Sequence, residues 1–334
     1  MTLVSVIIPT YNIKNELPRC LDSLIAQTYT ELEIIVVNDG STDGTDKVCD
    51  EYAKLDERIC IVHKENGGVS SARNAALKVA HGEYVACVDG DDYVEPDMIE
   101  TMVSAALKYE APLACCGYHQ HGKGAEHKVY SKKVTCLDRA EALLAYVTDD
   151  ERTRIYNSVW SKLFKRELLE GMVFPEGRES EDIFYTTWAL INAEKVAHVD
   201  RALYHYVLDR DGSIMNSKER LAQRRFEDEI PITHEQSRAF KNAGFADIAD
   251  RNEYKLSRKE LFYYLDFKKK GMKEAAKKLH KMMKSQKAEL FELYESGFVK
   301  TGDRVRLKLF LAFPRLYYYI VKLYDGVIVP IRLR

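Results

Sequence analysis

The stretch YVACVDGDDYVEPD, Tyr84 to Asp97, joins an apolar run to three aspartates within four positions. The run Tyr84–Val88 is short and continuous, as strands buried on both faces are. Asp89, Asp91 and Asp92 repel one another, and it is costly to remove such groups from water without a partner. A strand that ends in this cluster indicates either a turn washed by water or a site that receives a cation.

Three further apolar runs precede this one, and a helical pattern follows each of them. The predicted strands cover 4–9, 32–39, 59–64 and 84–89, and the predicted helices cover 16–27, 45–55 and 70–80. Apolar strands that alternate with helices predict an α/β fold with a Rossmann-like, mostly parallel sheet flanked by helices. The polar sequences PTYN, NDGSTDG, KENGG and DGDD all fall at the carboxyl ends of these strands, where such sheets bind ligands. They predict a binding site at that edge of the sheet.

Composition narrows the class of protein. The chain has 334 residues, 46% hydrophobic and 31% charged, which suits a soluble enzyme of one large or two smaller domains. A net charge of −2 argues against nucleic acid as a partner. The sequence shows no signal-peptide pattern and no apolar stretch long enough to span a bilayer. Seven cysteines without a Cys-x-x-Cys pair fit a reducing, cytoplasmic setting.

Three patterns typical of nucleotide or metal sites are absent or incomplete. The dinucleotide fingerprint Gly-x-Gly-x-x-Gly is absent after the first strand. GYHQHGKG, 117–124, has the glycine and lysine spacing of a phosphate-binding loop, but it ends in Gly124 where Ser or Thr should bind magnesium. His119, His121 and His127 lack an acid or cysteine at ligand spacing, so a polar hairpin loop is the preferred interpretation.

Five motifs, in order, carry a resemblance. VSVIIPTYN, VNDGSTDGT, NGGVSSARNAAL, VDGDDYVEPD and ESEDIFYTTWAL together resemble the family 2 inverting glycosyltransferases of bacterial surface-polysaccharide type, over roughly residues 1 to 215. The resemblance implies a GT-A fold, a nucleotide-sugar donor and a divalent metal, Mn²⁺ or Mg²⁺. It also implies a catalytic domain at 1–218, followed by a mainly helical region at 219–334 whose tail is basic and aromatic.

The resemblance assigns donor contacts at three strand ends. Asp39 accepts a hydrogen bond from the base, and a uracil N–H suits an acceptor-only carboxylate, so UDP is the expected nucleotide. Tyr11 packs on the base after Pro9, and Arg73 reaches the diphosphate or ribose from a helix start that favours phosphate. The expected donor-binding residues are Pro9, Tyr11, Asp39, Asn66, Gly67, Arg73 and Asp91. A helix-capping Asp39 and a solvated Arg73 are the alternatives without function.

The opening acids then hold a cation. By resemblance Asp91 and Asp92 form the metal motif, one binding the cation and the other the ribose or sugar. Asp89, still on the strand end, supports the turn. Hard cations take oxygen ligands and are often held by one or two carboxylates together with substrate phosphates. A solvated acidic turn is the alternative interpretation.

An inverting transfer also needs a base opposite the leaving group. In the family the aspartate of a Glu-Asp pair is this base, which corresponds to Asp182, with Glu181 as a supporting or sugar-binding residue. Acids at a helix start also complement the helix dipole, which is the alternative role. Arg210, in a loop expected to close over the diphosphate, neutralises leaving-group charge.

Three more side chains have open roles. His205 assists the acceptor or metal, or is a partly buried, hydrogen-bonded histidine. Trp160 stacks on a sugar or belongs to the core, and Lys162 contacts an acceptor.

The last third of the chain shows helical patterns only. A lysine-rich segment, 268–290, is expected to present a solvated basic face. The tail from Arg304 onward mixes Arg and Lys with Phe, Leu and Tyr, and it could lie in a membrane interface. Packing on the domain or on a second subunit, which would make a homo-oligomer, is the alternative.

The sequence therefore predicts a metal-dependent inverting glycosyltransferase. It would move a sugar from a nucleotide-sugar donor to a glycan or lipid-linked acceptor, in the cytoplasm or on the inner face of the plasma membrane. A sugar-1-phosphate nucleotidyltransferase is one rival, but PTYNIKNELP lacks the expected Gly-rich, Arg-containing loop. A non-catalytic glycan-binding protein is another, although it would be expected to have lost some of these acids.

Overall fold

A computed structural model describes residues 2–122, 125, 130–148, 153–178, 180–208 and 218–324. The chain divides into two compact units, Met1–Ile214 and Met215–Arg334. Arg210 and His127, together with Glu179 at the start of the ESEDIFYTTWAL motif, lie outside the described residues.

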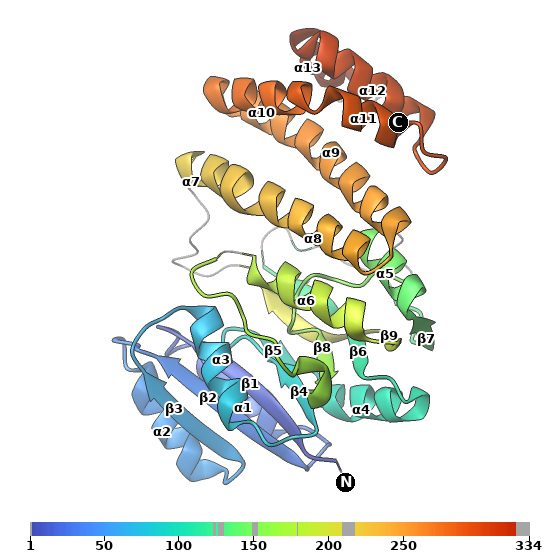
Figure 1. Ribbon diagram of the computed structural model, residues 1–334. Helices are drawn as coiled ribbons and strands as arrows, with labels where there is room; N and C mark the ends of the chain where they lie inside the picture. The colour runs from blue at the N-terminus through green and yellow to red at the C-terminus, as the bar shows by residue number, and fades with distance from the viewer. Residues whose placement is uncertain are drawn as a thin grey trace, which may run out of the picture. The chain divides into compact units, whose positions relative to one another are not determined.

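The first unit starts with four parallel strands in the order β3-β2-β1-β4 (Figure 1). These strands are β1 (Val4–Thr10), β2 (Leu32–Asp39), β3 (Ile59–Lys64) and β4 (Tyr84–Cys87). The intervening helices are α1 (Leu17–Ile25), α2 (Thr45–Leu55) and α3 (Val69–Val79). Val4 pairs with Leu32 on one side and with Tyr84 on the other. The alternation of strands and helices predicted from the sequence is confirmed.

The core of this half lies on both faces of the sheet. Val6 and Ile8 are fully buried in one cluster with Leu21 of α1. Ile7, between them, is also fully buried and points to the other face because side chains alternate along a strand. Burial on both faces is what turns these strands into continuous apolar runs.

The rest of the first unit extends the sheet with mixed directions. Strand β8 lies between β4 and β6, antiparallel to both, and β9 pairs parallel to β6. The further strands are β5 (Tyr93–Val94), β6 (Leu113–His121), β7 (Val134–Asp138), β8 (Lys162–Lys165) and β9 (Lys195–Val207). The further helices are α4 (Met98–Tyr109), α5 (Arg139–Val147), a 3₁₀ turn (Arg166–Leu169) and α6 (Glu181–Asn192). The segment 117–121, expected in a polar hairpin loop, is the second half of β6.

In the described residues, the second unit is helical, as expected for the C-terminal third. Its elements are α7 (Lys218–Gln223), a π-helix (Arg224–Glu229), α8 (Ile230–Asn242), α9 (Ala246–Lys269), α10 (Lys273–Ser285), α11 (Lys287–Tyr294), α12 (Thr301–Ala312) and α13 (Pro314–Leu323). Phe267, Leu279, Met283 and Phe310 are fully buried in its core. Among the helices described, none has the length and apolar character needed to cross a bilayer.

Candidate active site

The loops after β1 and β2 are tied together at the carboxyl edge of the sheet. The Asn12 N–H donates to Ser41 Oγ (3.1 Å), and Asn12 Oδ1 accepts from the Thr42 N–H (2.9 Å). Pro9 is the penultimate residue of β1, and the Tyr11 side chain in the loop is 48% exposed. The predicted base-stacking residue therefore presents its ring at the surface of this edge.

Asp39 organises the loop after β3. Its buried carboxylate accepts from the N–H groups of Gly67 (3.0 Å) and Gly68 (2.8 Å) and from Lys64 Nζ (2.6 Å). Asn66 Nδ2 donates to the Asp39 main-chain oxygen (2.9 Å). Asp39 is thus not a helix cap, and the Gly67 and Gly68 N–H groups point to a carboxylate in this structure. The Gly67 N–H also lies 3.2 Å from Oδ2, so each carboxylate oxygen receives two donors, and a ligand would have to share or replace one of them.

Lys64 was not singled out from the sequence. It ends β3 in register with Asp39, the last residue of β2. The signal was present, because neighbouring parallel strands that end together bring their last side chains together. Gly40, next along the chain, has φ +73°, and a Cβ there would lie 2.8 Å from the Asn66 main-chain nitrogen. This tight approach requires glycine.

Arg73 joins three acids from distant parts of the sequence. Its side chain is 2% exposed, and Nη1 lies 2.7 Å from Glu181 Oε1 and 3.0 Å from Asp182 Oδ1. Nη2 lies 2.9 Å from Asp89 Oδ1. The sequence predicts that Arg73 either contacts phosphate or is solvated. In the structure its guanidinium is buried among three carboxylates instead, where it can hold these acids in position.

Burial governs the acidity of this cluster. It raises the pKa of Asp182, Arg73 opposes the shift, and the negative Glu181 adds to it. Burial likewise raises the pKa of Asp89 to about 6 against the opposing charge of Arg73. Asp182 is therefore a better proton acceptor than an exposed aspartate, while remaining fixed in orientation. Ser180, directly before the pair, adopts a left-handed conformation (φ +63°), which is uncommon for a residue other than glycine.

Asp91 and Asp92 have different surroundings. Asp92 is 1% exposed, and its carboxylate accepts from the Tyr204 hydroxyl (2.7 Å) and the Val207 N–H (2.9 Å). Burial, with the negative charges of Asp89 and Asp91, raises its pKa to about 8. Asp91 is only partly buried, and its main-chain oxygen accepts from Arg19 Nη2 (2.6 Å). The predicted metal motif thus contains one buried, anchored carboxylate, that of Asp92, and one partly exposed carboxylate, that of Asp91.

These donors fit a hard divalent cation that is completed by its substrate. Within the described ranges, no group of three or more His, Cys, Asp or Glu side chains is placed to hold a metal alone. A cation bound here would take carboxylate oxygen from Asp91 and further oxygen from water and phosphate, which is the usual arrangement for Mg²⁺ in phosphate-handling enzymes.

Trp160, Lys162 and His205 are structural in their observed contacts. Trp160 is 8% exposed and stacks on Tyr204, with ring centres 4.2 Å apart, so the core interpretation holds. Lys162 is fully buried and donates to the main-chain oxygens of the preceding loop, so it is not placed to contact an acceptor. His205 bonds Glu95 Oε1 (2.8 Å) and stacks on Tyr93 (4.2 Å), as a partly buried histidine would.

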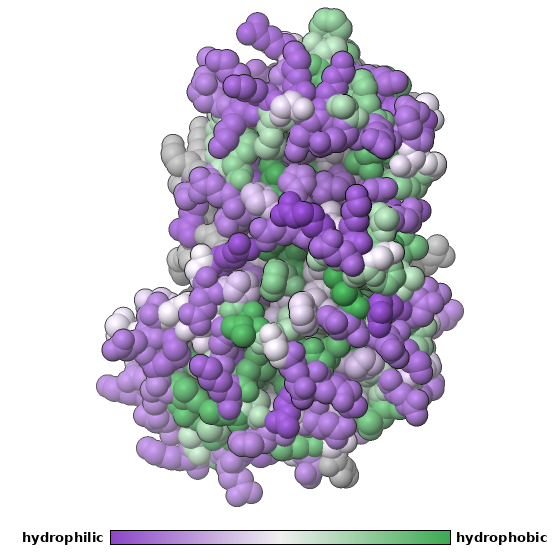
Figure 2. Space-filling view, viewed as in Figure 1, coloured by the Kyte–Doolittle hydropathy of each residue, from purple (hydrophilic) through white to green (hydrophobic). Residues whose placement is uncertain are grey.

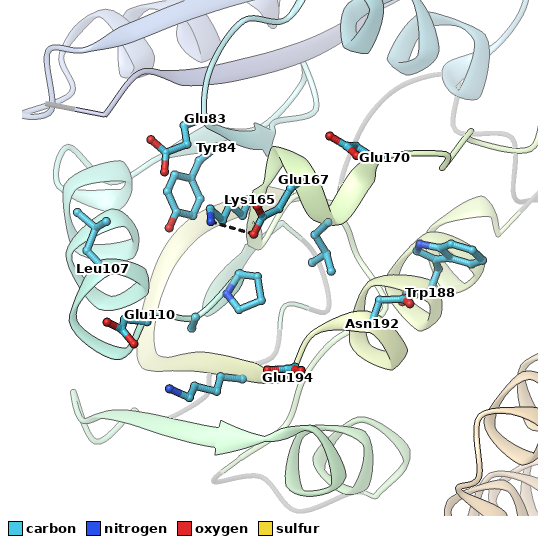
Figure 3. Close-up of a pocket in the computed structure, with 14 residues that line it drawn as sticks. Glu83, Tyr84, Leu107, Glu110, Lys165, Glu167, Glu170, Trp188, Asn192 and Glu194 are labelled. Atoms are coloured by element: carbon cyan, nitrogen blue, oxygen red, sulfur yellow. Dashed lines mark hydrogen bonds and ion pairs between the residues drawn. The ribbon is translucent and has the colours of Figure 1, made fainter.

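A cavity of about 720 Å³ is lined by none of the predicted donor-binding, metal or base residues (Figure 3). Its lining includes Tyr84, the first residue of β4, and Lys165, the last residue of the antiparallel β8, so it opens at the amino ends of the parallel strands. Lys165 forms an ion pair there with Glu167 (2.8 Å). Because the predicted donor and base residues lie at the carboxyl ends, this cavity is not part of the candidate active site.

The sheet, its helices and the acid-lined carboxyl edge define a GT-A-type α/β protein. Residues 5–172, half of the 334-residue chain, match the family described as Glycosyl transferase family 2. The chain belongs to this family.

Individual similarities agree with that assignment. Glycosyltransferase GlyA of Streptococcus pneumoniae serotype 4 is 36% identical over 219 residues, which is 63% of this chain and 31% of GlyA. This chain thus matches less than a third of that relative's length. The structure of S. aureus TarS 1-349 in complex with UDP-GlcNAc superposes with a TM-score of 0.62 at 23% identity, covering 76% of this chain and 71% of that one. Mannosyltransferase PcManGT from Pyrobaculum calidifontis, in complex with GDP-Man and Mn²⁺, gives 0.55 at 19% identity, covering 98% and 87%. At these identities the structures show the shared fold.

Proposed function

We propose that this protein is an inverting glycosyltransferase that moves a sugar from a UDP-sugar to an acceptor hydroxyl in surface-polysaccharide biosynthesis. The observation that carries the proposal is the cluster of Asp89, Glu181 and Asp182 on Arg73, at the same sheet edge as the Asp39 loop. A partly buried acid with a raised pKa beside a nucleotide-type edge suits proton abstraction from an alcohol.

The donor side is proposed to use the Asp39 edge. The Asp39 carboxylate would accept the uracil N–H in place of one of its present donors, and the exposed Tyr11 ring would stack on the base beside Pro9. Asn66 and Gly67 hold the loop that closes this side. UDP as the nucleotide is supported by the uracil argument and by the complex of TarS with UDP-GlcNAc, although the PcManGT structure is a complex with GDP-Man.

The base is proposed to be Asp182. The acceptor oxygen forms a bond to the anomeric carbon as the bond from that carbon to the diphosphate breaks, and Asp182 takes the acceptor proton. Arg73 holds the carboxylate in place, and Glu181 shares that guanidinium. A cation bound at Asp91, Mn²⁺ or Mg²⁺, would supply charge stabilisation for the departing diphosphate. Asp92 would support the loop, and Arg210 is proposed to add positive charge at the leaving group.

The acceptor is proposed to be a glycan or lipid-linked glycan, from the class of relatives that this chain resembles. A cytoplasmic setting agrees with the seven cysteines, all of which are free thiols.

Donor hydrolysis tests the proposed function because it needs no acceptor. The purified protein is incubated with a panel of UDP- and GDP-sugars, with Mn²⁺ or with excess chelator. Release of UDP from one UDP-sugar, only in the presence of metal, is expected. Release of GDP from a GDP-sugar, without release of UDP from any UDP-sugar, would show that the donor nucleotide is GDP. Formation of a nucleotide-sugar from a sugar-1-phosphate and UTP would favour the nucleotidyltransferase.

A further inference from the structure

Helix α13 carries an apolar stripe that the helical unit leaves uncovered. Leu316, Tyr319, Ile320 and Leu323 follow one another at intervals of three, one and three residues, which places them on one face of a helix. Their side chains are 50%, 65%, 46% and 60% exposed, respectively. These four residues are called the α13 stripe below.

The opposite face of α13 fixes the helix to its unit. Tyr317 is buried in the helical core, with its ring centre 5.5 Å from that of Phe310 of α12. Val321, one turn further on, packs against the same core. The stripe is therefore the outer face of a docked helix. The packing interpretation of the tail therefore holds for one face of α13, while the helical unit leaves the other face exposed.

The surroundings of the stripe are positively charged. Arg315 and Lys322 are exposed and lie seven residues apart, so they share one side of α13 next to the stripe. From Thr301 to Tyr324 there are five basic residues, Arg304, Arg306, Lys308, Arg315 and Lys322, and one acid, Asp303. Asp303 is buried and accepts from the Tyr254 hydroxyl, so it offers little compensating surface charge.

In Figure 2, apolar side chains reach the surface among hydrophilic ones at the end of the helical unit where α12 and α13 lie. We propose that the α13 stripe binds an anionic lipid surface, lying in the headgroup region with Arg315 and Lys322 against the lipid phosphates. An exposed apolar stripe with a basic flank has the features of a helix that lies in the plane of a membrane. Tyrosines suit that depth because their rings are apolar and their hydroxyls are polar.

Charge disfavours a second copy of this chain as the occupant. A two-fold pairing through the stripe would bring Arg315 and Lys322 of both copies to one interface, and Pro314–Leu323 contains no acid to compensate them. A bilayer of anionic lipids supplies that compensation.

Vesicle co-sedimentation of the full chain tests the proposal. Wild type is expected to bind vesicles of phosphatidylcholine with phosphatidylglycerol and to bind pure phosphatidylcholine weakly. Ile320→Glu/Leu323→Glu should remove binding to both. Arg315→Glu/Lys322→Glu should lower binding to the anionic vesicles by at least about tenfold, since each basic residue near the surface adds measurably to the affinity. Leu55→Glu, at an exposed apolar position (73%) in α2, is the matched control and should bind like wild type.

The outcomes separate the possibilities. Failure of wild type to bind anionic vesicles at low salt overturns the proposal, as does equal binding by wild type and the stripe variant. A dimer in size-exclusion chromatography that the stripe variant loses, without vesicle binding, assigns the face to a second copy. If the stripe variant Ile320→Glu/Leu323→Glu has a lowered melting temperature, the test uses Arg315→Glu/Lys322→Glu, whose changes are both at exposed positions. Unchanged binding of this variant to anionic vesicles would then overturn the proposal. Donor hydrolysis is measured in solution on the same samples, so loss of the proposed activity and loss of lipid binding are distinguished.

Discussion

Arg73 Nη1 lies 3.0 Å from Asp182 Oδ1, which joins residues 109 positions apart in one partly buried ion pair. The same guanidinium also contacts Glu181 and Asp89. The Arg73 guanidinium thus orients the proposed base, Asp182, relative to the loop after β4, which carries the proposed metal ligand Asp91. Truncation of one partner in such a pair leaves an uncompensated charge inside the protein.

Asp182→Asn separates a base from a binding residue. The substitution keeps the shape of the side chain but removes its ability to take a proton. Donor affinity should change little, while single-turnover transfer slows by roughly 10²–10⁴-fold. Asp39→Asn is the control with the opposite pattern, because it weakens nucleotide binding and affects the chemical step less. Near-normal transfer by Asp182→Asn at saturating donor would assign the proton to Glu181 or another acid.

Arg73→Lys tests the positioning of the acids. Lysine keeps the charge but loses the planar fork that reaches three carboxylates at once. We expect kcat to fall with little change in KM for the donor, together with a lower melting temperature. Arg201→Lys is a matched control, since Arg201 pairs with Asp97 at the surface. A loss of donor affinity without loss of kcat would instead indicate that Arg73 contacts the donor diphosphate, as the sequence predicts.

The pH dependence follows from the raised pKa of Asp182. The base works only when ionised, so kcat/KM should fall as pH decreases through a pKa that is higher than that of an ordinary aspartate. In Arg73→Lys the opposing contact weakens, and the acid limb should move to still higher pH. A pH–rate profile for donor transfer measures both. An acid limb at the ordinary aspartate value in wild type would argue against a buried base.

Metal removal should abolish turnover, and added Mn²⁺ or Mg²⁺ should restore it. Asp91→Asn should raise the metal concentration needed for half-maximal rate, because it removes the partly exposed carboxylate of the pair. Asp92→Asn should lose most activity yet stay folded, because asparagine can accept from the Tyr204 hydroxyl but places its own N–H group against the Val207 N–H, which would shift the loop that carries Asp91. Full activity in excess chelator would exclude the metal role.

Glu260 gives a stability prediction in the helical unit. Its carboxyl is 2% exposed, Oε1 has no hydrogen-bond partner, and burial raises its pKa to about 7, opposed by His234. The unfolded chain ionises near the ordinary value, so stability falls as pH rises from about 4.5 to about 7, by roughly 3 kcal/mol in total. Glu260→Gln should flatten the decline of the melting temperature between pH 5 and pH 8. If the melting temperatures of wild type and Glu260→Gln fall equally between pH 5 and pH 8, Glu260 is not the cause of the decline.

The sequence predicted the first four strands and their helices because each is a local pattern of apolar residues. Strand β8 was not predicted, since four residues of apolar character do not distinguish a strand from a helical turn, and its partners lie far along the chain. The contacts of Arg73 were not predicted either, because its partners also lie far along the chain. Its spacing from Gly68 identifies a helix start, but no spacing reveals acids more than a hundred residues away. Lys64 could have been found from the paired strand ends.

The anchored carboxylate of Asp92 has a consequence for the order of binding. Because both oxygens of Asp92 accept hydrogen bonds from β9, Asp91 is the more accessible carboxylate of the pair for a cation. A cation held mainly by one carboxylate and water binds weakly, and the diphosphate supplies the oxygens that are lacking. Metal and donor should therefore show reciprocal linkage, each raising the affinity of the other by the same factor. The resting protein would carry little metal, and the nucleotide-sugar would bring the cation with it.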